Sequence, residues 1–565
     1  MSNDCQTLQS TVPAPRWLKA AAWALTAAAA AALLLNAATT SIWEDEANGY
    51  FLSSRPLGEM LALMADNIHE DPPLFDAVMN GWIRVVGRNL FWLRGLSIAF
   101  WFVMLPGLFL SVRRLASERA AWAALAVAAL LPLNWLMPAS LRWYSLFACL
   151  CIWNFYFFLR MVFPAGDDRK EGRPESSRLL RSMPYWLTGA AMWYTNYSAL
   201  VVFFSHLLIA VFCPGPKRPR LADLVFSWTA IGLLYVPWLP TFYQQLGASP
   251  KSHSLANMAT SIWVLLAGEF STPLELGMAI PVAALAAAVA LGAAVQWRQC
   301  WIPVLVIAVV LLAMCLAGVI WTRRVLFLSP FVAMLIALAI CPRESAGRRL
   351  FGGRVCMAGL LVAVSALSLA QMARRTDWLS YRWLDPCREA VERVQSECPQ
   401  AVILTNSNPV FFYLDDGRGK NLAQEGMKSH ESGRPRALIY PFPDHLLPDY
   451  EPLLADASAA AYIYQAAYGG PVTAGYGRLV ERMARFGFEP VRAEGLLKAS
   501  SGFLRHHPLF RGRELAPIDE HRVVVVHFRK AAGLAKTSPR RGNGLEPGAQ
   551  DLYHSPAPET ARHGG

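Results

Sequence analysis

The sequence predicts an α-helical polytopic membrane protein with about eleven transmembrane helices and a C-terminal extracytoplasmic α/β domain. Three observations lead to this prediction. First, 55% of the 565 residues are hydrophobic and 16% are charged, whereas a soluble domain carries about 25% charged residues. Second, apolar stretches of about 20 residues, the length that crosses a bilayer, recur between residues 17 and 373. Third, β-type runs alternate with helical patterns from residue 374 onward, as in a small α/β domain.

The overall composition narrows the classes of protein further. The 20 Trp, 28 Phe and 17 Tyr residues exclude a disordered or fibrous chain. The net charge of +12 fits either a nucleic-acid-binding protein or a membrane protein with basic cytoplasmic loops, and the positions of the charges decide between the two. The ten cysteines show no CxxC or Cys/His ligand spacing, so a zinc module is not expected.

The predicted spans follow one another at short intervals. The first, residues 17–40, is too long and too poor in a cleavage site to be an obvious signal peptide. Residues 184–213 are long for one span and short for two, and basic loops on both sides favour two short spans that turn near Thr195-Asn196-Tyr197. The remaining predicted spans are residues 91–112, 120–137, 141–159, 224–241, 275–295, 301–320, 325–341 and 355–373.

The distribution of basic residues predicts the orientation. With the N-terminus in the cytoplasm, nineteen Lys and Arg residues fall in the cytoplasmic segments and eight in the opposite loops, in agreement with the positive-inside rule. An odd number of spans then puts residues 374 onward outside. The net positive charge is therefore almost entirely a topology signal, and we expect no nucleic-acid partner.

Within the predicted membrane domain, residues 1–373, the first outside loop is unusual. This loop, residues 41–90, is long and carries eight acidic residues. It contains two amphipathic patterns at helical spacing, which can lie flat in the membrane interface or simply pack within the loop. The apolar positions are Leu57, Met60, Leu61 and Met64 in the first pattern, and Leu74, Val78, Trp82 and Val85 in the second.

Residues 374–529 are predicted to form the extracytoplasmic α/β domain. Strand-like runs occur at 401–405, 461–464 and 523–526, with helical patterns at 386–397 and 478–486 between them. The helical pattern between Cys387 and Cys398 keeps their thiols apart, so free thiols are favoured over a disulfide. We find no nucleophile motif, phosphate loop or metal signature in this region. Residues 530–565 are rich in Gly, Pro, Ser and charged residues, and we expect them to be disordered.

Two acidic motifs in the first outside loop are candidate sites. Trp43-Glu44-Asp45-Glu46 places three acids at the membrane surface, where they can handle a cation, a metal or a proton, or can simply be a solvated start of the loop. His69-Glu70-Asp71-Pro72-Pro73 precedes a helical pattern. Its double proline also fits an ordinary helix start.

Two predicted outside turns carry arginine, although basic residues are otherwise fewer in the outside loops than in the cytoplasmic ones. They are Arg142-Trp143-Tyr144 and Trp321-Thr322-Arg323-Arg324. A guanidinium matches phosphate oxygens, and an ordinary headgroup anchor is the alternative at each turn. Together with the acids, these turns gather carboxylates and arginines at one face. Arginine neutralises a phosphate leaving group and a carboxylate accepts a proton from an attacking hydroxyl, so this combination suits a phosphate-linked lipid substrate.

These motifs, taken in order, resemble those of the GT-C membrane glycosyltransferases. The resemblance is to the family 39 type, which includes protein O-mannosyltransferases and lipid A aminoarabinose transferases, and it covers residues 40–335. Asn196 and Val325 stand where the family often has His and Tyr, and Asp71 replaces a His that often precedes the double Pro. The matching motifs are Asp45-Glu46-Ala47, Pro72-Pro73-Leu74-Phe75, Gly87, Leu93-Arg94-Gly95-Leu96-Ser97, Arg142-Trp143-Tyr144, Tyr194-Thr195-Asn196-Tyr197, Tyr235-Val236-Pro237-Trp238-Leu239-Pro240 and Arg324-Val325-Leu326-Phe327 with Pro330.

The resemblance implies a hexosyl- or pentosyltransferase of the cell envelope. Such an enzyme moves a sugar from a polyprenyl-phosphate donor to a glycan, lipid or protein acceptor, at a hydroxyl or phosphate, on the extracytoplasmic face. Asp45 would be the general base or an acceptor-positioning carboxylate, and Glu46 would shape or polarise the same site. The donor phosphate would bind Arg142, Arg323 and Arg324. The substrate cavity would be lined by His69, Asp71, Tyr144, Asn196 and Tyr197.

The resemblance also implies the surroundings of the enzyme. We expect an integral protein of a bacterial inner membrane, in contact with membrane lipids, whose outer domain recognises or orients the acceptor. We expect no cofactor and no metal, although other GT-C enzymes bind a divalent cation through acidic loops. The alternative function is a transporter or flippase of lipid-linked saccharides, which predicts polar residues deep in the spans and repeated halves. A third reading is a non-catalytic scaffold whose outer domain binds a partner.

Overall fold

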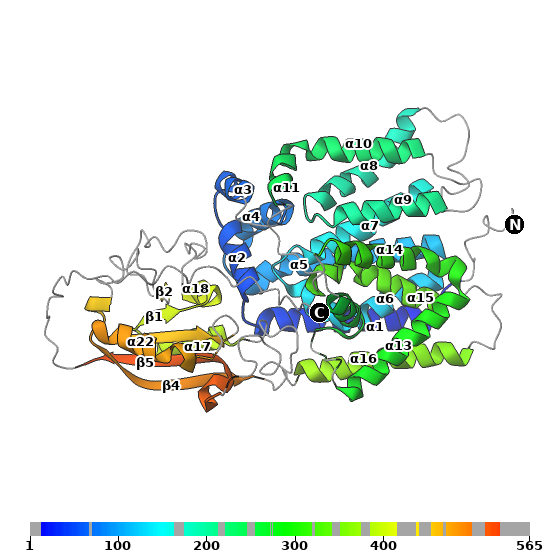
Figure 1. The fold of residues 1–565 in the computed structure, drawn as a ribbon. Helices are drawn as coiled ribbons and strands as arrows, with labels where there is room; N and C mark the ends of the chain where they lie inside the picture. Colours follow the sequence, from blue (N-terminus) through cyan, green and yellow to red (C-terminus); the bar gives the residue numbers. More distant parts are fainter. Residues whose placement is uncertain are drawn as a thin grey trace, which may run out of the picture.

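The fold is taken from a computed structural model of the chain. It describes residues 13–66, 71–162, 175–212, 221–245, 255–341 (apart from 270, 272, 274 and 319–321), 351–373, 385–414, 437–439, 454–466, 471–499, 513 and 515–531. A helical half and a sheet-containing half lie next to each other, and helices α2, α3 and α4 lie where the two meet (Figure 1).

The helical half contains long apolar helices. Seven of the described helices are long and apolar enough to cross a membrane, and the bent pair formed by α6 and the 3₁₀ turns after it makes an eighth, with a 67° bend. Between them lie shorter apolar helices. The helices of this half are α1 (Arg16–Thr39), α5 (Leu90–Leu115), α6 (Glu118–Leu130), η1 (Pro132–Trp135), η2 (Met137–Ala139), α7 (Tyr144–Val162), α8 (Glu175–Trp193), α9 (Ala199–Phe212), α10 (Leu221–Tyr235), η4 (Val236–Trp238), α11 (Leu239–Gln245), α12 (Leu255–Ala267), α13 (Leu276–Val295), α14 (Trp297–Leu316), η5 (Thr322–Leu328), α15 (Ser329–Ile340) and α16 (Phe351–Ala373).

The membrane-protein fold is confirmed, with seven or eight long spans among the described residues where about eleven spans were predicted. A helix occupies each of the eleven predicted spans. Helices α8, α9 and α15 fall short of the criterion for a span because α9 and α15 have only 14 and 12 residues and α8 begins with a polar turn. The predicted turn near Thr195-Asn196-Tyr197 separates α8 from α9, as expected. The sequence reading missed α12, whose 13 residues are too few for a spanning stretch.

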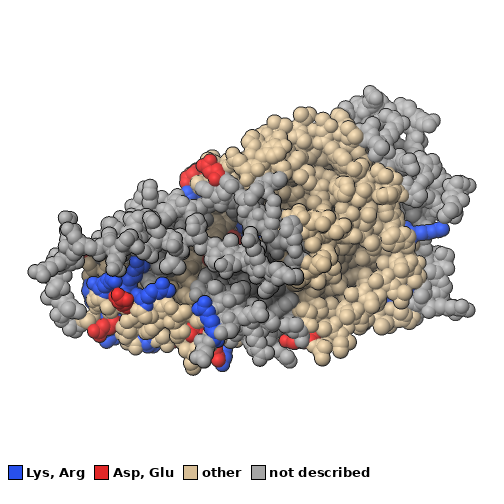
Figure 2. Space-filling model, viewed as in Figure 1, with Lys and Arg blue, Asp and Glu red and all other residues tan. Residues whose placement is uncertain are grey.

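The surface of the helical half agrees with insertion into a membrane. On the face seen in Figure 2, the described residues of this half show few charged side chains, whereas charged side chains gather on the described part of the other half. Large apolar side chains are exposed on several spans, among them Leu233, Leu291 and Leu316 at 67–70%. Apolar side chains that face outward in this number indicate contact with lipid rather than water. The chain is therefore an integral membrane protein; its orientation stays a prediction.

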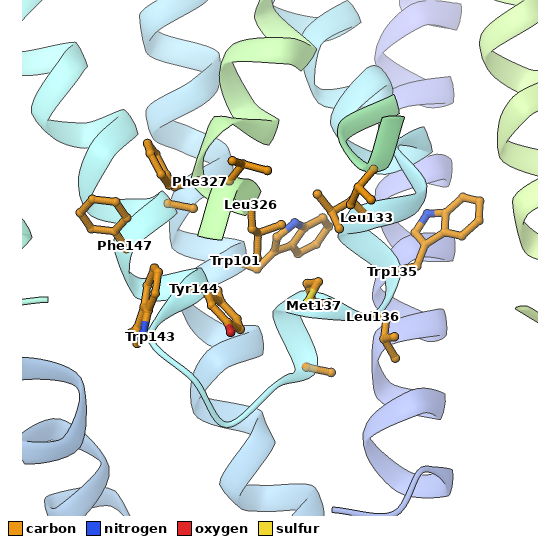
Figure 3. Packing of buried hydrophobic residues seen from close by; sticks show 14 of the residues in the cluster. Trp101, Leu133, Trp135, Leu136, Met137, Trp143, Tyr144, Phe147, Leu326 and Phe327 are labelled. Carbon is orange, nitrogen blue, oxygen red and sulfur yellow. The ribbon is translucent and has the colours of Figure 1, made fainter. Parts of the chain in front are cut away.

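Part of the buried core of the helical half consists of aromatic side chains. Trp101 of α5, Phe147 of α7 and Phe327 of η5 are each at most 2% exposed, and the rings of Phe147 and Phe327 lie edge to face with centroids 4.8 Å apart. Figure 3 shows Leu326 next to Trp101 in the same cluster. This packing holds η5 against the start of α7 although the two segments are far apart in the sequence.

Three short helices connect the first span to the rest of the helical half: α2 (Glu44–Ser53), α3 (Leu57–Ala65) and α4 (Leu74–Val86). The two predicted amphipathic helices correspond to α3 and α4. Met60 and Met64 of α3 are buried, as expected, but α4 buries its other face, with Asp76 and Asn80, and leaves Val85 76% exposed. Of the apolar stripe predicted on α4, Val85 is exposed, whereas Leu74 and Trp82 are partly buried against the core.

The second half is built on a five-stranded sheet in the order β2-β1-β3-β5-β4. Strand β1 is parallel to β2 and β3, and β5 is antiparallel to β3 and β4. Val523 to Val526 of β5 are at most 1% exposed, so both faces of the sheet centre are covered. The elements are α17 (Cys387–Glu397), β1 (Val402–Thr405), α18 (Asn408–Leu414), β2 (Ala437–Ile439), β3 (Ala459–Gln465), α22 (Thr473–Arg485), β4 (Phe488–Lys498), η8 (Pro517–Glu520) and β5 (His521–Lys530).

The α/β class of this domain is confirmed, as are the three predicted strands and two predicted helices. Cys387 and Cys398 are free thiols, as favoured. Two of the five strands were missed. Strand β2 has only three residues, and β4 is an edge strand with mostly exposed side chains and a register shift between Pro490 and Arg492. Proline and charged residues are typical of edge strands, and they hide the strand pattern in the sequence. The predicted disordered tail, apart from the end of β5 and Ala531, lies outside the described residues.

Close packing between spans gives a first testable prediction. A Cβ atom on Gly292 of α13 would lie 2.9 Å from Cβ of Ala339 on α15, which cannot rotate away. We expect Gly292→Val to destabilise the protein by about 1–3 kcal/mol because the helices must separate. Thermal unfolding in detergent should therefore show a lower Tm. Gly277→Val is the matched control, because Gly277 lies on the same helix with nothing within 4 Å; equal Tm values for both variants would contradict the packing argument.

Candidate functional site

The start of α2 is held by a buried ion pair. Arg94 of α5 and Glu46 of α2 are 1% and 0% exposed, and Arg94 Nη2 lies 2.7 Å from Glu46 Oε2 while Nε lies 3.2 Å from Oε1. The other N–H groups of Arg94 donate to the end of the first span, with distances of 2.9 Å to the carbonyl oxygens of Thr40 and Ser41. One guanidinium thus joins α5, the end of α1 and the first turn of α2.

Glu46 accepts two further hydrogen bonds from the backbone. The N–H of Leu141 donates to Oε1 at 2.8 Å, and the N–H of Trp43 donates to Oε2 at 3.3 Å. Both carboxylate oxygens are therefore engaged and shielded from solvent. Glu46 follows Asp45 directly on α2, and its engaged carboxylate suits a positioning role better than direct contact with a substrate.

Asp45 differs from its neighbour. It is partly exposed, and it makes no hydrogen bond or ion pair within the described part of the chain. Its charge nevertheless acts on Arg142, which belongs to the turn before α7. A carboxylate that is accessible, uncommitted and near a cation can accept a proton or bind a polar substrate group.

Several acidic side chains interact electrostatically with Arg142. Its Nη2 lies 2.7 Å from Oδ2 of Asp71, and the two side chains are only 14% and 11% exposed. Burial lowers the pKa of Arg142, but Asp71, Tyr144, Asp45 and Asp76 raise it above its ordinary value by a larger amount, so the guanidinium stays charged. Its Nε is buried and has no hydrogen-bond partner among the described residues. A donor therefore remains for an incoming anion.

Helix α4 ties the other end of α2 to the same region. Asp76 Oδ1 accepts a hydrogen bond of 2.9 Å from the Ser53 hydroxyl, at the last residue of α2. The side-chain amide of Asn80 donates to the carbonyl oxygens of Ser53 and Arg55 at 2.7 and 2.6 Å. These bonds satisfy carbonyl groups that the end of a helix leaves open. Helix α2 is thus fixed at both ends.

The turn between α8 and α9 adds aromatic and polar groups. The hydroxyl of Tyr197 donates to Gln245 Oε1, and burial, together with the charge of Asp71, raises the pKa of Tyr197 to about 12. Asn196 Oδ1 accepts the N–H of Ser198 at 2.9 Å, which stabilises the turn itself. Tyr144 is buried and packs edge to face on Trp143. The structure thus brings Asp45, Asp71, Arg142, Tyr144 and Tyr197 together.

Three predicted residues are less well placed. Arg324 is partly exposed on η5, which packs against α7 through Phe327, so it lies on the neighbouring segment. The side chain of Arg323 and the whole of His69 lie outside the described residues. The role of these three residues stays a prediction.

A cluster in the outer domain has ligand atoms suited to a metal. In the described ranges, Glu397, Glu494 and His527 place their ligand atoms within 4.8 Å of one another. Arg492 is already paired with Glu397, and Arg393 Nη1 lies 3.1 Å from Glu494 Oε2. Two guanidinium groups already compensate these carboxylates, so we interpret the cluster as an ion-pair network.

Sequence reasoning missed Arg94, Asp76 and Asn80 as parts of the site. Arg94 had been counted only as a loop charge and as part of a motif. Its signal was available, because a charge inside an apolar helix usually has a buried partner. Asp76 and Asn80 lie four residues apart on α4, and polar residues at that spacing share a helix face.

The chain has the fold of a known membrane enzyme. No family model and no curated protein matches the sequence. The apo crystal structure of ArnT from Cupriavidus metallidurans matches with a TM-score of 0.52 and 12% identity, over 90% of this chain and 98% of that chain. The structure of that ArnT bound to undecaprenyl phosphate gives 0.48 and 13%, over 91% and 99%. The apo oligosaccharyltransferase from Archaeoglobus fulgidus gives 0.44 and 12%, over 67% and 58%. Of these three structures, the first has a TM-score above 0.5, and it shows that the chain has an ArnT-like fold.

The buried ion pair gives a second prediction. Replacing Arg94 by Met leaves the Glu46 carboxylate buried without its cation, which costs about 3–5 kcal/mol in comparable cases. We therefore expect Arg94→Met to lower the Tm in detergent strongly or to prevent folding. Glu481→Gln removes the ion pair of Glu481 with Arg485 on α22, in which both side chains are 70% exposed, and should change the Tm little. A Tm for Arg94→Met equal to that of the wild type would refute the anchoring role.

Proposed function

We propose that the protein is a glycosyltransferase that moves a sugar from a polyprenyl-phosphate donor to an acceptor hydroxyl or phosphate. The observation that carries this proposal is the uncommitted Asp45 beside the charged Arg142, at the end of the first span. A carboxylate can accept the proton of an acceptor hydroxyl, and a guanidinium can offset the negative charge of the leaving phosphate. The two groups together therefore act on both the attacking and the leaving oxygen. The finer assignment, to family 39, belongs to the same proposal.

The proposed chemistry is a single displacement. The acceptor oxygen forms a bond to the anomeric carbon while the bond from that carbon to the phosphate oxygen breaks, and the configuration at the anomeric carbon is inverted. Asp45 takes the proton of an acceptor hydroxyl. An acceptor phosphate is already ionised, and Asp45 would then position it. Glu46 keeps α2 in place throughout and exchanges no proton.

Arg142 is proposed to hold the donor phosphate. Its unpartnered Nε offers a hydrogen bond, and its charge offsets the negative charge that the leaving phosphate develops. Arg324 and Arg323, on the segment next to α7, would add to this binding. Tyr144, Asn196, Tyr197, Asp71 and His69 would line the cavity around the sugar.

The fold supports this substrate class. The ArnT whose apo structure shares the fold has also been crystallised bound to undecaprenyl phosphate. A donor of this kind places its isoprenoid tail among apolar helices and its phosphate at the membrane surface, which is where the proposed site lies. We propose that this surface is the extracytoplasmic face of a bacterial inner membrane, because of the charge bias of the loops.

The third prediction tests the proposed base. The assay supplies the purified chain with radiolabelled undecaprenyl-phosphate-linked hexose or pentose, with envelope membranes as acceptor. We expect Asp45→Asn to reduce turnover by about 10²–10⁴-fold, because the amide cannot accept the proton. Glu59→Gln, which alters a nearby acid on α3, should leave turnover unchanged.

The outcomes of this assay separate the alternatives. Equal turnover by the wild type and Asp45→Asn would remove Asp45 from the mechanism. Movement of the intact labelled lipid across reconstituted vesicles, without sugar transfer, would favour a transporter or flippase. Deep in the helices, His206 is stacked on Phe158 at 4.3 Å and is fully buried, so this polar residue gives no support to a transport path.

A fourth prediction concerns donor binding. Arg142→Ala should weaken binding of undecaprenyl phosphate about tenfold to a hundredfold, the effect expected from losing a charge-assisted hydrogen bond. Intrinsic tryptophan fluorescence or native mass spectrometry can measure this affinity. The control is Arg84→Ala, an exposed arginine on α4. Unchanged affinity in Arg142→Ala would show that the phosphate binds elsewhere.

A further inference from the structure

The outer α/β domain makes direct contact with the helix that carries Asp45. Helix α18 packs against α2 at the junction of the two halves (Figure 1). Asn408, the first residue of α18, lies at the centre of this contact. Its backbone N–H donates to Glu44 Oε2 at 3.2 Å, and its side-chain amide donates to Glu44 Oε1 and, at 2.8 Å, to Asn48 Oδ1. Glu44 and Asn48 are four residues apart, so they share one face of α2.

Further contacts surround this hydrogen-bonded group. The backbone N–H of Ile42 donates to the hydroxyl of Tyr413 at 2.7 Å, just before α2 begins. The rings of Tyr50 and Phe412 meet edge to face, with centroids 5.1 Å apart, and Arg88 lies over the Phe412 ring at 4.9 Å. Asn408 is itself only 5% exposed. The contact is therefore a packed interface.

The two neighbours of Asp45 are anchored in different halves of the protein. Glu44 is bonded to the outer domain, whereas Glu46 is bonded to Arg94 in the membrane domain. Successive residues of an α-helix are about 100° apart around its axis. Two anchors on opposite sides of Asp45 thus fix the rotation of α2, and with it the direction in which the Asp45 side chain leaves the helix.

We propose that the outer domain is a positioning element for Asp45, and that Glu44 and Asn408 form the coupling between them. This inference rests on the proposed role of Asp45, but the coupling itself does not. The domain contributes to turnover by holding α2 in one rotational state, since small displacements of a catalytic group strongly reduce the rate. Glu44 is then a positioning residue.

The pair allows a charge-neutral exchange. In Glu44→Gln one of the two acceptor oxygens becomes an NH₂ group that faces an N–H group of Asn408, and in Asn408→Asp two carboxylates face each other. The double variant Glu44→Gln/Asn408→Asp restores a donor opposite an acceptor. Glu481→Gln is the control, because Glu481 and Arg485 form an exposed ion pair on α22 of the same domain.

The fifth prediction is that each single variant lowers kcat about tenfold, the scale expected of a misplaced catalytic group. The KM for undecaprenyl-phosphate-linked sugar should stay the same because Arg142 is untouched. The double variant should regain kcat to within about threefold of the wild type, since its hydrogen bonds are restored. The proposal would be overturned if the KM changed together with kcat in the single variants. It would also be overturned if both single variants kept the wild-type kcat. A double variant no better than the singles would overturn it as well.

Hydrogen exchange gives a readout that is independent of catalysis. We expect backbone amides of α2, residues 44–53, to exchange faster in Glu44→Gln and to return to wild-type protection in the double variant. If the wild type transfers no sugar, the proposed function fails, and this measurement alone decides on the coupling. Unchanged protection of α2 in both single variants would overturn the coupling whatever the activity.

Discussion

The buried ion pair between Arg94 and Glu46 is the interaction on which the rest of the site depends. Neither charge is stable without the other in a region from which water is excluded. Arg94 fixes the end of the first span through the carbonyl groups of Thr40 and Ser41. Glu46 also accepts the N–H of Leu141, the residue before Arg142. One carboxylate therefore places both its neighbour Asp45 and the turn that carries Arg142.

The charge balance around Arg142 shapes what the site can bind. Three aspartates, at positions 45, 71 and 76, act on this one guanidinium in the described structure, and Asp71 is directly bonded to it. Among the described residues, the acids that act on Arg142 therefore outnumber this one cation. A donor phosphate that enters must share Arg142 with Asp71, so its binding depends on how far this pair can rearrange. Tyr144 packs on Trp143, and Tyr197 is hydrogen-bonded to Gln245. These two fixed side chains limit the rearrangement of the pair.

The sequence predicted the fold class because membrane insertion leaves a strong local signal. Every predicted span is helical, and three strands of the outer domain carry runs of apolar residues. Short α12 and the polar edge strand β4 lack that signal and were missed. The candidate residues Asp45, Asp71, Arg142 and Tyr197 do lie together, whereas the pairing of Arg94 with Glu46 escaped prediction. That pairing joins positions 48 residues apart, and no local pattern specifies which charge meets which.

The contact between Glu44 and Asn408 has a consequence for how the molecule is made. It joins residues that are 364 positions apart, one just after the first span and the other in the domain that follows the last. During synthesis, all the membrane helices leave the ribosome before Asn408 does. Helix α2 therefore lacks one of its two anchors until the C-terminal domain has been synthesised and folded. A chain whose translation stops before Asn408 cannot form this second anchor.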